Sequence, residues 1–226
     1  MVKSTAAGDE KILCYEDVVL RRSDLDILSG PEFLNDRIIE FYFSYLTSSD
    51  SSKKKLFFPP AMAFWVANCP DAQSLHDVLE PLNLPSYDIV VFPVNNNDDV
   101  SKAEGGSHWS LLAYHKKSGV FLHHDSSRGL NHVHALRLFR CVSQFLDASG
   151  SPKYKKADTP KQVNGYDCGV YVIAIAKVIS AWNEESEEAG MEDLWISEVK
   201  KQVTPANVAA LRREILELIK SLMEKN

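Results

Sequence analysis

Apolar residues recur every three to four positions in several stretches of the chain, and this spacing predicts helices with one buried face. The longest such stretch lies near the C-terminal end, where residues 205–223 carry an apolar face that we interpret as core packing. The apolar stretch 168–182 follows a polar loop and predicts a second well-defined helix. Further helices are predicted over about 32–46, 60–66, 72–82, 132–146 and 192–202.

Continuous apolar stretches in the middle of the chain predict β-strands. Segments 108–115 and 119–125 are joined by Lys116-Lys117-Ser118-Gly119, a connection typical of an antiparallel hairpin. Residues 88–94 predict a buried strand, and residues 154–157 a short one. Helices before and after a group of strands predict an α+β fold, with a central mixed sheet flanked by helices.

The length of 226 residues fits one large domain, because a chain of this size buries about 70–75% of its unfolded surface. Residues 1–10 are small and polar, and we expect a flexible N-terminus followed by a single catalytic domain over residues 11–226. We see no internal repeat and no linker.

Net charge and cysteine usage narrow the classes of function. The formal net charge is −6 and the pI is about 5.7, which argues against nucleic acid as a partner. No apolar stretch approaches the roughly 20 residues that span a bilayer, so no membrane association is expected. Four separated cysteines and no signal sequence indicate a reducing compartment, cytoplasmic and/or nuclear. Neither a paired cysteine motif nor His-Glu-x-x-His is present, so we expect no metal and no other cofactor.

Cys168 is the cysteine whose surroundings indicate chemistry. It stands where the polar stretch 162–167 meets an apolar helix, and a helix N-terminus favours an anion such as a thiolate. Gly169 leaves room there for a substrate backbone to approach. The other three cysteines fit the more common role of small buried apolar side chains; they are Cys14, Cys69 and Cys141.

A nucleophilic thiol needs a base, and the base needs a group that orients it. His108 begins the first strand of the predicted hairpin, and Asp125 ends the second, so the two are expected to be neighbours in space. The simpler alternative is that Asp125 only caps a turn. Gln162, six positions before Cys168, is placed to donate an amide N–H to an oxyanion, with the Cys168 backbone N–H as a second donor.

These residues together resemble the Ulp/sentrin-specific cysteine proteases, peptidase type C48. The resemblance lies in His108-Trp109, in Asp125-Ser126, and in Gln162 followed by Asp167-Cys168-Gly169. Phe33-Leu34-Asn35-Asp36 is similar to the family's Trp-Leu-Asn-Asp motif, with phenylalanine in place of tryptophan. The likeness extends from about Val18 to the last helix, and the short chain most resembles the small deneddylase branch.

The resemblance implies a papain-like cysteine-protease superfold and cleavage after the C-terminal Gly-Gly of a Nedd/Rub-type modifier. It implies catalytic roles for Cys168, His108, Asp125 and Gln162, and substrate contacts by Trp109, Phe33, Asn35, Asp36, Asn164, Gly165, Asp167 and Gly169. Just before Gly-Gly, the family's Nedd/Rub modifier carries alanine where ubiquitin carries arginine. Implied partners are the modifier and its conjugates, such as cullins, with the enzyme acting as a monomer.

Three alternatives stay open at this point. A SUMO-specific protease of the same fold would differ only at the surface that binds the modifier. A catalytically inactive module that binds ubiquitin-like modifiers would lack the complete set of catalytic residues. An acetyltransferase of related fold would use the same residues on coenzyme A, and the sequence shows no insertion for that coenzyme.

Overall fold

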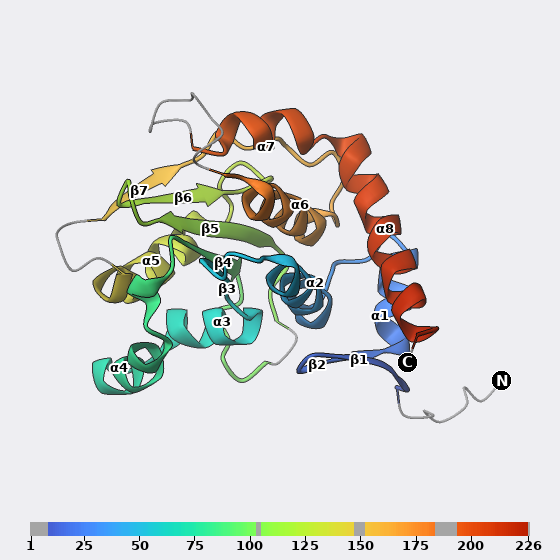
Figure 1. Ribbon diagram of the computed structural model, residues 1–226, viewed down its shortest axis with the longest axis horizontal. Helices are drawn as coiled ribbons and strands as arrows, with labels where there is room; N and C mark the ends of the chain where they lie inside the picture. The colour runs from blue at the N-terminus through green and yellow to red at the C-terminus, as the bar shows by residue number, and fades with distance from the viewer. Residues whose placement is uncertain (1–8, 103–104, 147–151, 184–193, 226) are drawn as a thin grey trace.

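A five-stranded mixed sheet forms the centre of the computed structural model, which describes residues 9–102, 105–146, 152–183 and 194–225 (Figure 1). The strand order is β3-β4-β5-β6-β7, with parallel pairs at the two edges and antiparallel pairs between them. The predicted hairpin is β5–β6, and the predicted strand 88–94 is β4. The bounds are β3 (Lys55–Phe57), β4 (Ile89–Asn95), β5 (Trp109–His115), β6 (Val120–His124) and β7 (Lys153–Lys156).

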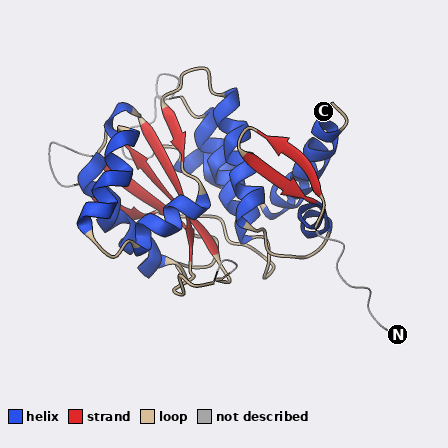
Figure 2. Cartoon of the chain, turned by 90° about the horizontal axis from the view of Figure 1, so that it is seen from below, coloured by secondary structure: helices blue, strands red, loops and turns tan. Residues whose placement is uncertain are grey.

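Alternation along the strands divides the apolar side chains between two cores. Val91, Leu111 and Leu122 point to one face, whereas Phe92 and Leu112 point to the other. Helices cover both faces, so the sheet lies between two helical layers (Figure 2). One layer contains α2 (Asp36–Ser49) and α6 (Cys168–Ala181), and the other contains α3 (Pro60–Asn68) and α5 (His132–Leu146). The prediction of an α+β fold with a mixed central sheet is confirmed.

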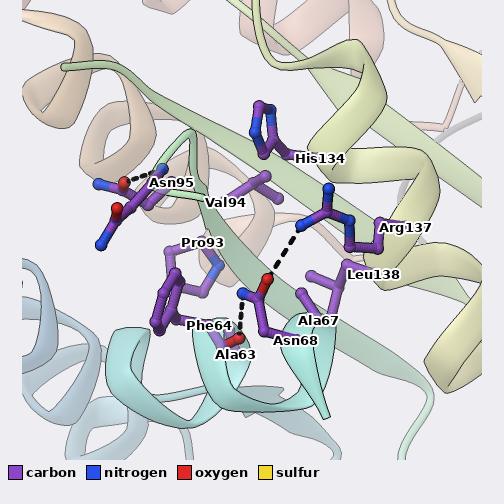
Figure 3. Close-up of a pocket in the computed structure, with 11 residues that line it drawn as sticks. Ala63, Phe64, Ala67, Asn68, Pro93, Val94, Asn95, His134, Arg137 and Leu138 are labelled. Carbon is purple, nitrogen blue, oxygen red and sulfur yellow. Dashed lines mark hydrogen bonds between the residues drawn. The ribbon is translucent and has the colours of Figure 1, made fainter. Parts of the chain in front are cut away.

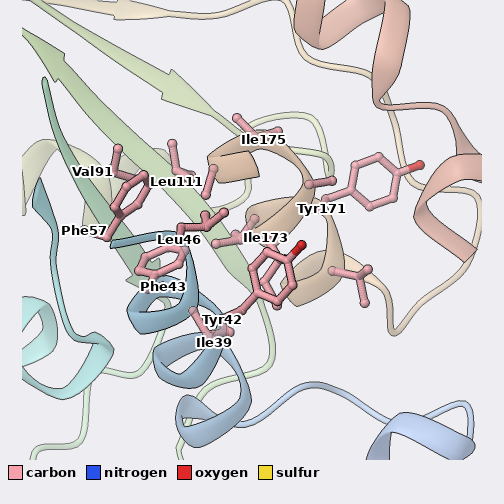
Figure 4. Packing of buried hydrophobic residues seen from close by; sticks show 14 of the residues in the cluster. Ile39, Tyr42, Phe43, Leu46, Phe57, Val91, Leu111, Tyr171, Ile173 and Ile175 are labelled. Atoms are coloured by element: carbon pink, nitrogen blue, oxygen red, sulfur yellow. The ribbon is translucent and has the colours of Figure 1, made fainter. Parts of the chain in front are cut away.

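The helix that begins at Cys168 is almost completely buried. Eleven of the fourteen residues of α6 are buried, because the sheet, α2 and α8 (Pro205–Met223) surround it. Figure 4 shows Ile173 and Ile175 of this helix packed beside Phe43 of α2 and Leu111 of the sheet. A helix that is apolar on every side is typical of a core position. The N-terminus of α6, and with it Cys168, is therefore held on a rigid element.

The N-terminal part contains elements that the apolar pattern did not predict. β1 (Lys11–Tyr15) and β2 (Val18–Arg21) form a separate hairpin, and α1 (Arg22–Ser29) follows directly. These elements are short, so few periods of the pattern are available. Cys14 lies exposed on β1, and the expectation that it is buried is wrong. Of the predicted flexible N-terminus, Asp9 and Glu10 are described; both hydrogen-bond to the start of α1, and residues 1–8 lie outside the described residues.

The first predicted helix begins later than expected. The pattern placed its start at about Glu32, but α2 begins at Asp36. Asn35 is the N-cap, and its side-chain oxygen accepts a hydrogen bond from the Ile38 backbone N–H at 3.1 Å. An asparagine side chain that caps in this way stabilises the helix start at that residue.

The remaining helices follow the predictions closely. The region predicted over 72–82 is α4 (Ala72–Leu79) followed by the 3₁₀ turn η1 (Glu80–Leu82), with η2 (Leu84–Ser86) after it. The helix predicted over 192–202 is α7 (Ile196–Gln202), and its first predicted residues lie outside the described part of the chain. None of the helices in the described ranges is long and apolar enough to cross a membrane.

Candidate active site

The predicted nucleophile stands at the first position of α6. Cys168 is fully buried, whereas Cys69 and Cys141 are partly exposed on the other side of the sheet. Its neighbour is His108, which hydrogen-bonds to it. The sequence separates these residues by sixty positions, and the fold brings them together because α6 packs against β5.

His108 and Asp125 form a short, buried contact. His108 Nε2 lies 2.7 Å from Asp125 Oδ1, at the open end of the β5–β6 hairpin, so these two predicted neighbours do meet. Burial favours the neutral imidazole, but the hydrogen bonds and charges of Asp125 and Cys168 outweigh it and raise the pKa of His108 to about 9. Because Asp125 occupies Nε2, Nδ1 is the ring nitrogen that remains for Cys168.

Two backbone donors hold the Asp125 carboxylate in addition to His108. The Ser127 N–H donates to Oδ1 at 2.8 Å, and the Asn131 N–H donates to Oδ2 at 2.9 Å. Burial alone would raise the pKa of Asp125, but these hydrogen bonds and His108 lower it to about 2. The carboxylate is therefore ionised at every physiological pH. It does cap the turn at Ser127, as the simpler alternative held, but it contacts His108 as well.

Asn131 is a site residue that sequence reasoning missed. It is fully buried, and its Nδ2 donates to the carbonyl oxygens of Val94 at 2.9 Å and His108 at 3.2 Å. Together with its backbone bond to Asp125, it joins three segments around the histidine. In the sequence it is simply a polar residue before a helix, and no local signal reveals these distant partners.

Gln162 is oriented by hydrogen bonds on both sides of its amide. Its Oε1 accepts from Ser126 Oγ at 2.7 Å, and its Nε2 donates to the Asn164 carbonyl at 2.7 Å. Asn164 in turn accepts the backbone N–H of Asp167 on Oδ1 at 3.0 Å and donates Nδ2 to the Asp167 carboxylate at 2.7 Å. The second hydrogen on Gln162 Nε2 is geometrically separate from the Asn164 bond, as an oxyanion donor requires.

Asp167 and Gly169, on either side of Cys168, have structural partners. Asp167 is buried and pairs with Arg212 of α8, with 2.9 Å between Nε and Oδ1. A Cβ at Gly169 would lie 2.8 Å from Leu34 Cβ, so the space that the sequence analysis assigned to a substrate backbone is occupied by Leu34. Gly165, in contrast, has no atoms near its Cβ position.

A groove of about 390 Å³ lies beside His108. Trp109 and Phe33 both line it, but in different ways. Trp109 is only 5% exposed and donates Nε1 to the Leu34 carbonyl at 2.9 Å, whereas Phe33 is 47% exposed. Trp109 therefore holds the backbone of the segment 33–36, and the Phe33 side chain projects from that segment. Asp36 also lines the groove.

Asn35, a predicted substrate contact, already has partners for its side-chain amide. Besides capping α2, it donates Nδ2 to Asp24 Oδ1 at 2.6 Å. Asp24 is fully buried and pairs with Arg37. The side chain of Asn35 therefore holds the shape of the groove wall, which is a role the sequence pattern did not separate from substrate contact.

Polar contacts from α5 reach Asp98, in the loop that leads from β4 to His108. Arg137 donates Nη1 to Asn68 Oδ1 at 2.9 Å, so α5 is joined to α3 near Asn95 (Figure 3). Arg137 and His134 both contact Asp98, at 3.3 and 3.2 Å. The loop is thereby attached to α5 one turn after Asn131.

His123 and His124 are buried beside the site but face other partners. His123 lies 3.0 Å from Ser110 Oγ and 2.9 Å from Tyr154 OH. His124 Nε2 accepts the Trp195 indole N–H at 3.0 Å. Burial lowers the pKa of His123 to about 4 and that of His124 to about 3, so both are neutral near pH 7. Among the described residues, no group of three or more His, Cys, Asp or Glu side chains is arranged to hold a metal ion.

Comparison with known proteins identifies the class. The family model described as the Ulp1 protease family, C-terminal catalytic domain, matches residues 32–215. NEDD8-specific protease 1 of Arabidopsis thaliana is 52% identical over 221 residues, 97% of each chain. Sentrin-specific protease 8 of Homo sapiens is 32% identical, covering 96% of this chain and all of the other.

Solved structures of low sequence identity share the fold. The SUMO protease Ulp1, with its catalytic cysteine oxidised to a sulfenic acid, aligns with a TM-score of 0.71 at 21% identity, over 95% of this chain and 89% of the other. The Ulp1 protease domain bound to Smt3 aligns with a TM-score of 0.67 at 19% identity, over 96% and 90%. The fold and the matched family define a ubiquitin-like-specific cysteine protease, as the sequence resemblance predicted. The chain belongs to the Ulp1 protease family.

Proposed function

We propose that this protease cleaves the bond after the C-terminal Gly-Gly of a Nedd/Rub-type modifier, in conjugates and in the modifier precursor. The main support for this specificity is the 52% identity to a NEDD8-specific protease across 97% of both chains. The structural neighbours that act on SUMO are 19–21% identical, so they support the fold and not the choice of modifier.

The contact that carries the proposed mechanism is the one between His108 and Asp125. With Nε2 bonded to Asp125 at 2.7 Å, the imidazole presents Nδ1 to Cys168. The raised pKa of His108, about 9, favours the imidazolium at neutral pH. We assign Cys168 as the nucleophile, His108 as general base and acid, and Asp125 as the group that orients and stabilises the imidazolium.

The reaction then proceeds by acyl transfer. The Cys168 thiolate attacks the carbonyl carbon of the last glycine, and Gln162 Nε2 with the Cys168 backbone N–H stabilises the oxyanion. The tetrahedral intermediate collapses as the amine leaves with the proton from His108, and a thioester remains. His108 next takes a proton from water, whose oxygen attacks the thioester. The second tetrahedral intermediate collapses by breaking the carbon–sulfur bond, so the Cys168 thiolate is restored beside the protonated His108. The modifier leaves as a carboxylic acid that ionises in water.

The groove beside His108 is the proposed site for the Gly-Gly tail. Trp109 and Phe33 both line it, and a residue with a Cβ would compete with them for space. The alanine that precedes Gly-Gly in the Nedd/Rub modifier fits an apolar entrance. The arginine of ubiquitin at that position would bury an unpaired charge, which costs several kcal/mol.

Specificity constants on C-terminal fluorogenic derivatives of Nedd/Rub, SUMO and ubiquitin test the proposal. We expect kcat/KM for Nedd/Rub to exceed both others by at least a hundredfold, about 2.7 kcal/mol. Cys168→Ala should bind the modifier without cleaving it. Phe33→Trp, assayed in parallel, measures what the exposed ring contributes to the entrance. Equal cleavage of the SUMO derivative would refute the choice of modifier and leave only the protease class.

The proposal extends to partners and location. We propose that modifier conjugates such as cullins are its substrates, and that the enzyme acts as a monomer in the cytoplasm, the nucleus or both. Incubation of a neddylated cullin with wild type and with Cys168→Ala tests the first of these statements directly. The cullin should lose its modifier only in the presence of Cys168.

A further inference from the structure

A buried arginine from the C-terminal helix reaches the residue directly before the nucleophile. Arg212 of α8 is 7% exposed, and its Nε donates to Asp167 Oδ1 at 2.9 Å. Its other nitrogens donate to three backbone carbonyls at the end of α1 and just after it: Nη1 to Ile27 at 2.9 Å and Gly30 at 3.1 Å, and Nη2 to Glu32 at 2.8 Å. The guanidinium is therefore held firmly by partners on two segments.

Asp167 occupies the N-cap position of α6 but does not act as a cap. An aspartate at this position normally accepts a hydrogen bond from the backbone N–H two or three residues later, here Gly169 or Val170. Within the described residues, the Asp167 side chain makes no such bond. Its two oxygens are used by Arg212 and by Asn164 Nδ2, at 2.9 and 2.7 Å.

The unused cap matters because Cys168 is the next residue. The N-terminal end of a helix stabilises an anion through its free N–H groups and its dipole. A carboxylate in the capping position would take those N–H groups and place a second negative charge beside the thiolate. Like charges at short distance destabilise each other, so both the thiolate and the oxyanion would be disfavoured.

We propose that Arg212 is a positioning residue, which holds the Asp167 carboxylate away from the N-terminus of α6 and so leaves that helix end to Cys168 and the oxyanion. Arg212 does not touch the substrate in this proposal. It acts through Asp167, and its anchoring to the Ile27, Gly30 and Glu32 carbonyls keeps the guanidinium from following the carboxylate toward the helix.

The test compares two alkylating reagents of similar size and different charge. Neutral iodoacetamide and anionic iodoacetate are reacted with the full chain, and alkylation of Cys168 is followed by mass spectrometry of its peptide. Arg212→Met removes the charge and keeps an unbranched side chain. We expect the iodoacetate-to-iodoacetamide rate ratio to fall about fivefold, the factor for two unit charges about 4 Å apart in water. kcat should fall about tenfold or more.

A second substitution distinguishes charge from packing. Arg212→Met/Asp167→Asn lacks the carboxylate, so the rate ratio should return to within about twofold of wild type, and kcat should recover at least in part. The lost anchors at Ile27, Gly30 and Glu32 remain lost in both variants, so any increase in KM should persist. Arg213→Met, an exposed neighbour on the same helix, is the matched control and should leave the ratio unchanged.

Each possible result of these alkylation experiments either supports or overturns the role of Arg212. An unchanged ratio in folded Arg212→Met overturns the proposal, and so does a double variant that is as slow as the single one. If Arg212→Met does not fold, the double variant decides: the proposal requires it to fold with a ratio near that of wild type. Alkylation needs no modifier, so these results do not depend on whether Nedd/Rub is the substrate.

Discussion

Replacing Asp125 by asparagine tests the centre of the proposed mechanism with almost no change in shape. The carboxylate accepts hydrogen bonds from His108 and Ser127 on Oδ1, and from Asn131 on Oδ2. An asparagine has one acceptor oxygen, so its amino group must face at least one of these donors. The orientation with oxygen toward His108 places N–H against the Asn131 N–H, where 2.9 Å separates the heavy atoms in the wild type.

The magnitude follows from the pKa of His108. Its rise from 6.5 to about 9 corresponds to about 3.4 kcal/mol of preference for the imidazolium, which Asp125 shares with Cys168. This amount already contains the hydrogen bond between His108 and Asp125. If Asp125 supplies the larger part of it, the barrier rises by about 2–3 kcal/mol, and a wrong imidazole tautomer raises it further. We therefore expect kcat to fall by at least about 10²-fold, toward the roughly 10⁴-fold loss of the same substitution in a serine-protease triad.

The assay is single-turnover cleavage of a fluorogenic Nedd/Rub derivative, with thermal unfolding measured on the same samples. His123→Gln is the control, because this neighbouring histidine is also buried but bonds to Ser110 and Tyr154 instead. It should retain far more activity than Asp125→Asn. The reasoning is refuted if Asp125→Asn is folded and turns over within tenfold of wild type, or if only the histidine variant is inactive.

Two further predictions concern stability. Gly169→Ala should lower the free energy of unfolding by about 1–3 kcal/mol, because its Cβ would approach Leu34 Cβ to 2.8 Å. Gly165→Ala meets no neighbouring atom and should leave the free energy of unfolding unchanged. Equal denaturant midpoints for the two variants would contradict this prediction. The folded pKa of His124, about 3, lies below the unfolded value of 6.5, so stability is full above pH 6.5 and is lost as pH falls toward 3. Between pH 7 and pH 5 this loss is about 2 kcal/mol. His124→Gln keeps an acceptor for Trp195 and should reduce the pH dependence of the free energy of unfolding by that amount. An unchanged pH dependence would show that the buried, neutral His124 is not its source.

The sequence predicted most of the elements because their physical causes are local. Spacing of apolar residues defined α6 and α8, and the short polar connection between two apolar strands defined the β5–β6 hairpin. The hairpin also explains why the proximity of His108 and Asp125 could be predicted from the sequence, since a tight turn determines which strand ends meet. The elements that it missed, β1, β2, α1 and β3, are three to eight residues long and carry too few periods of the pattern.

The sequence alone determined the class of chemistry. Its signal is a cysteine at a polar-to-apolar boundary with a glycine directly after it. His108 and Asp125 precede this cysteine in the order that the protease family shows. Tertiary structure alone decided what supports that chemistry. Asp167 meets Arg212 across 45 positions, and Gly169 meets Leu34 from the opposite half of the sequence. The spacing of apolar residues shows which face of a helix is buried, but not which element covers that face. Contacts that form only when α2, α6 and α8 pack together therefore cannot be predicted from the sequence of any one of these segments.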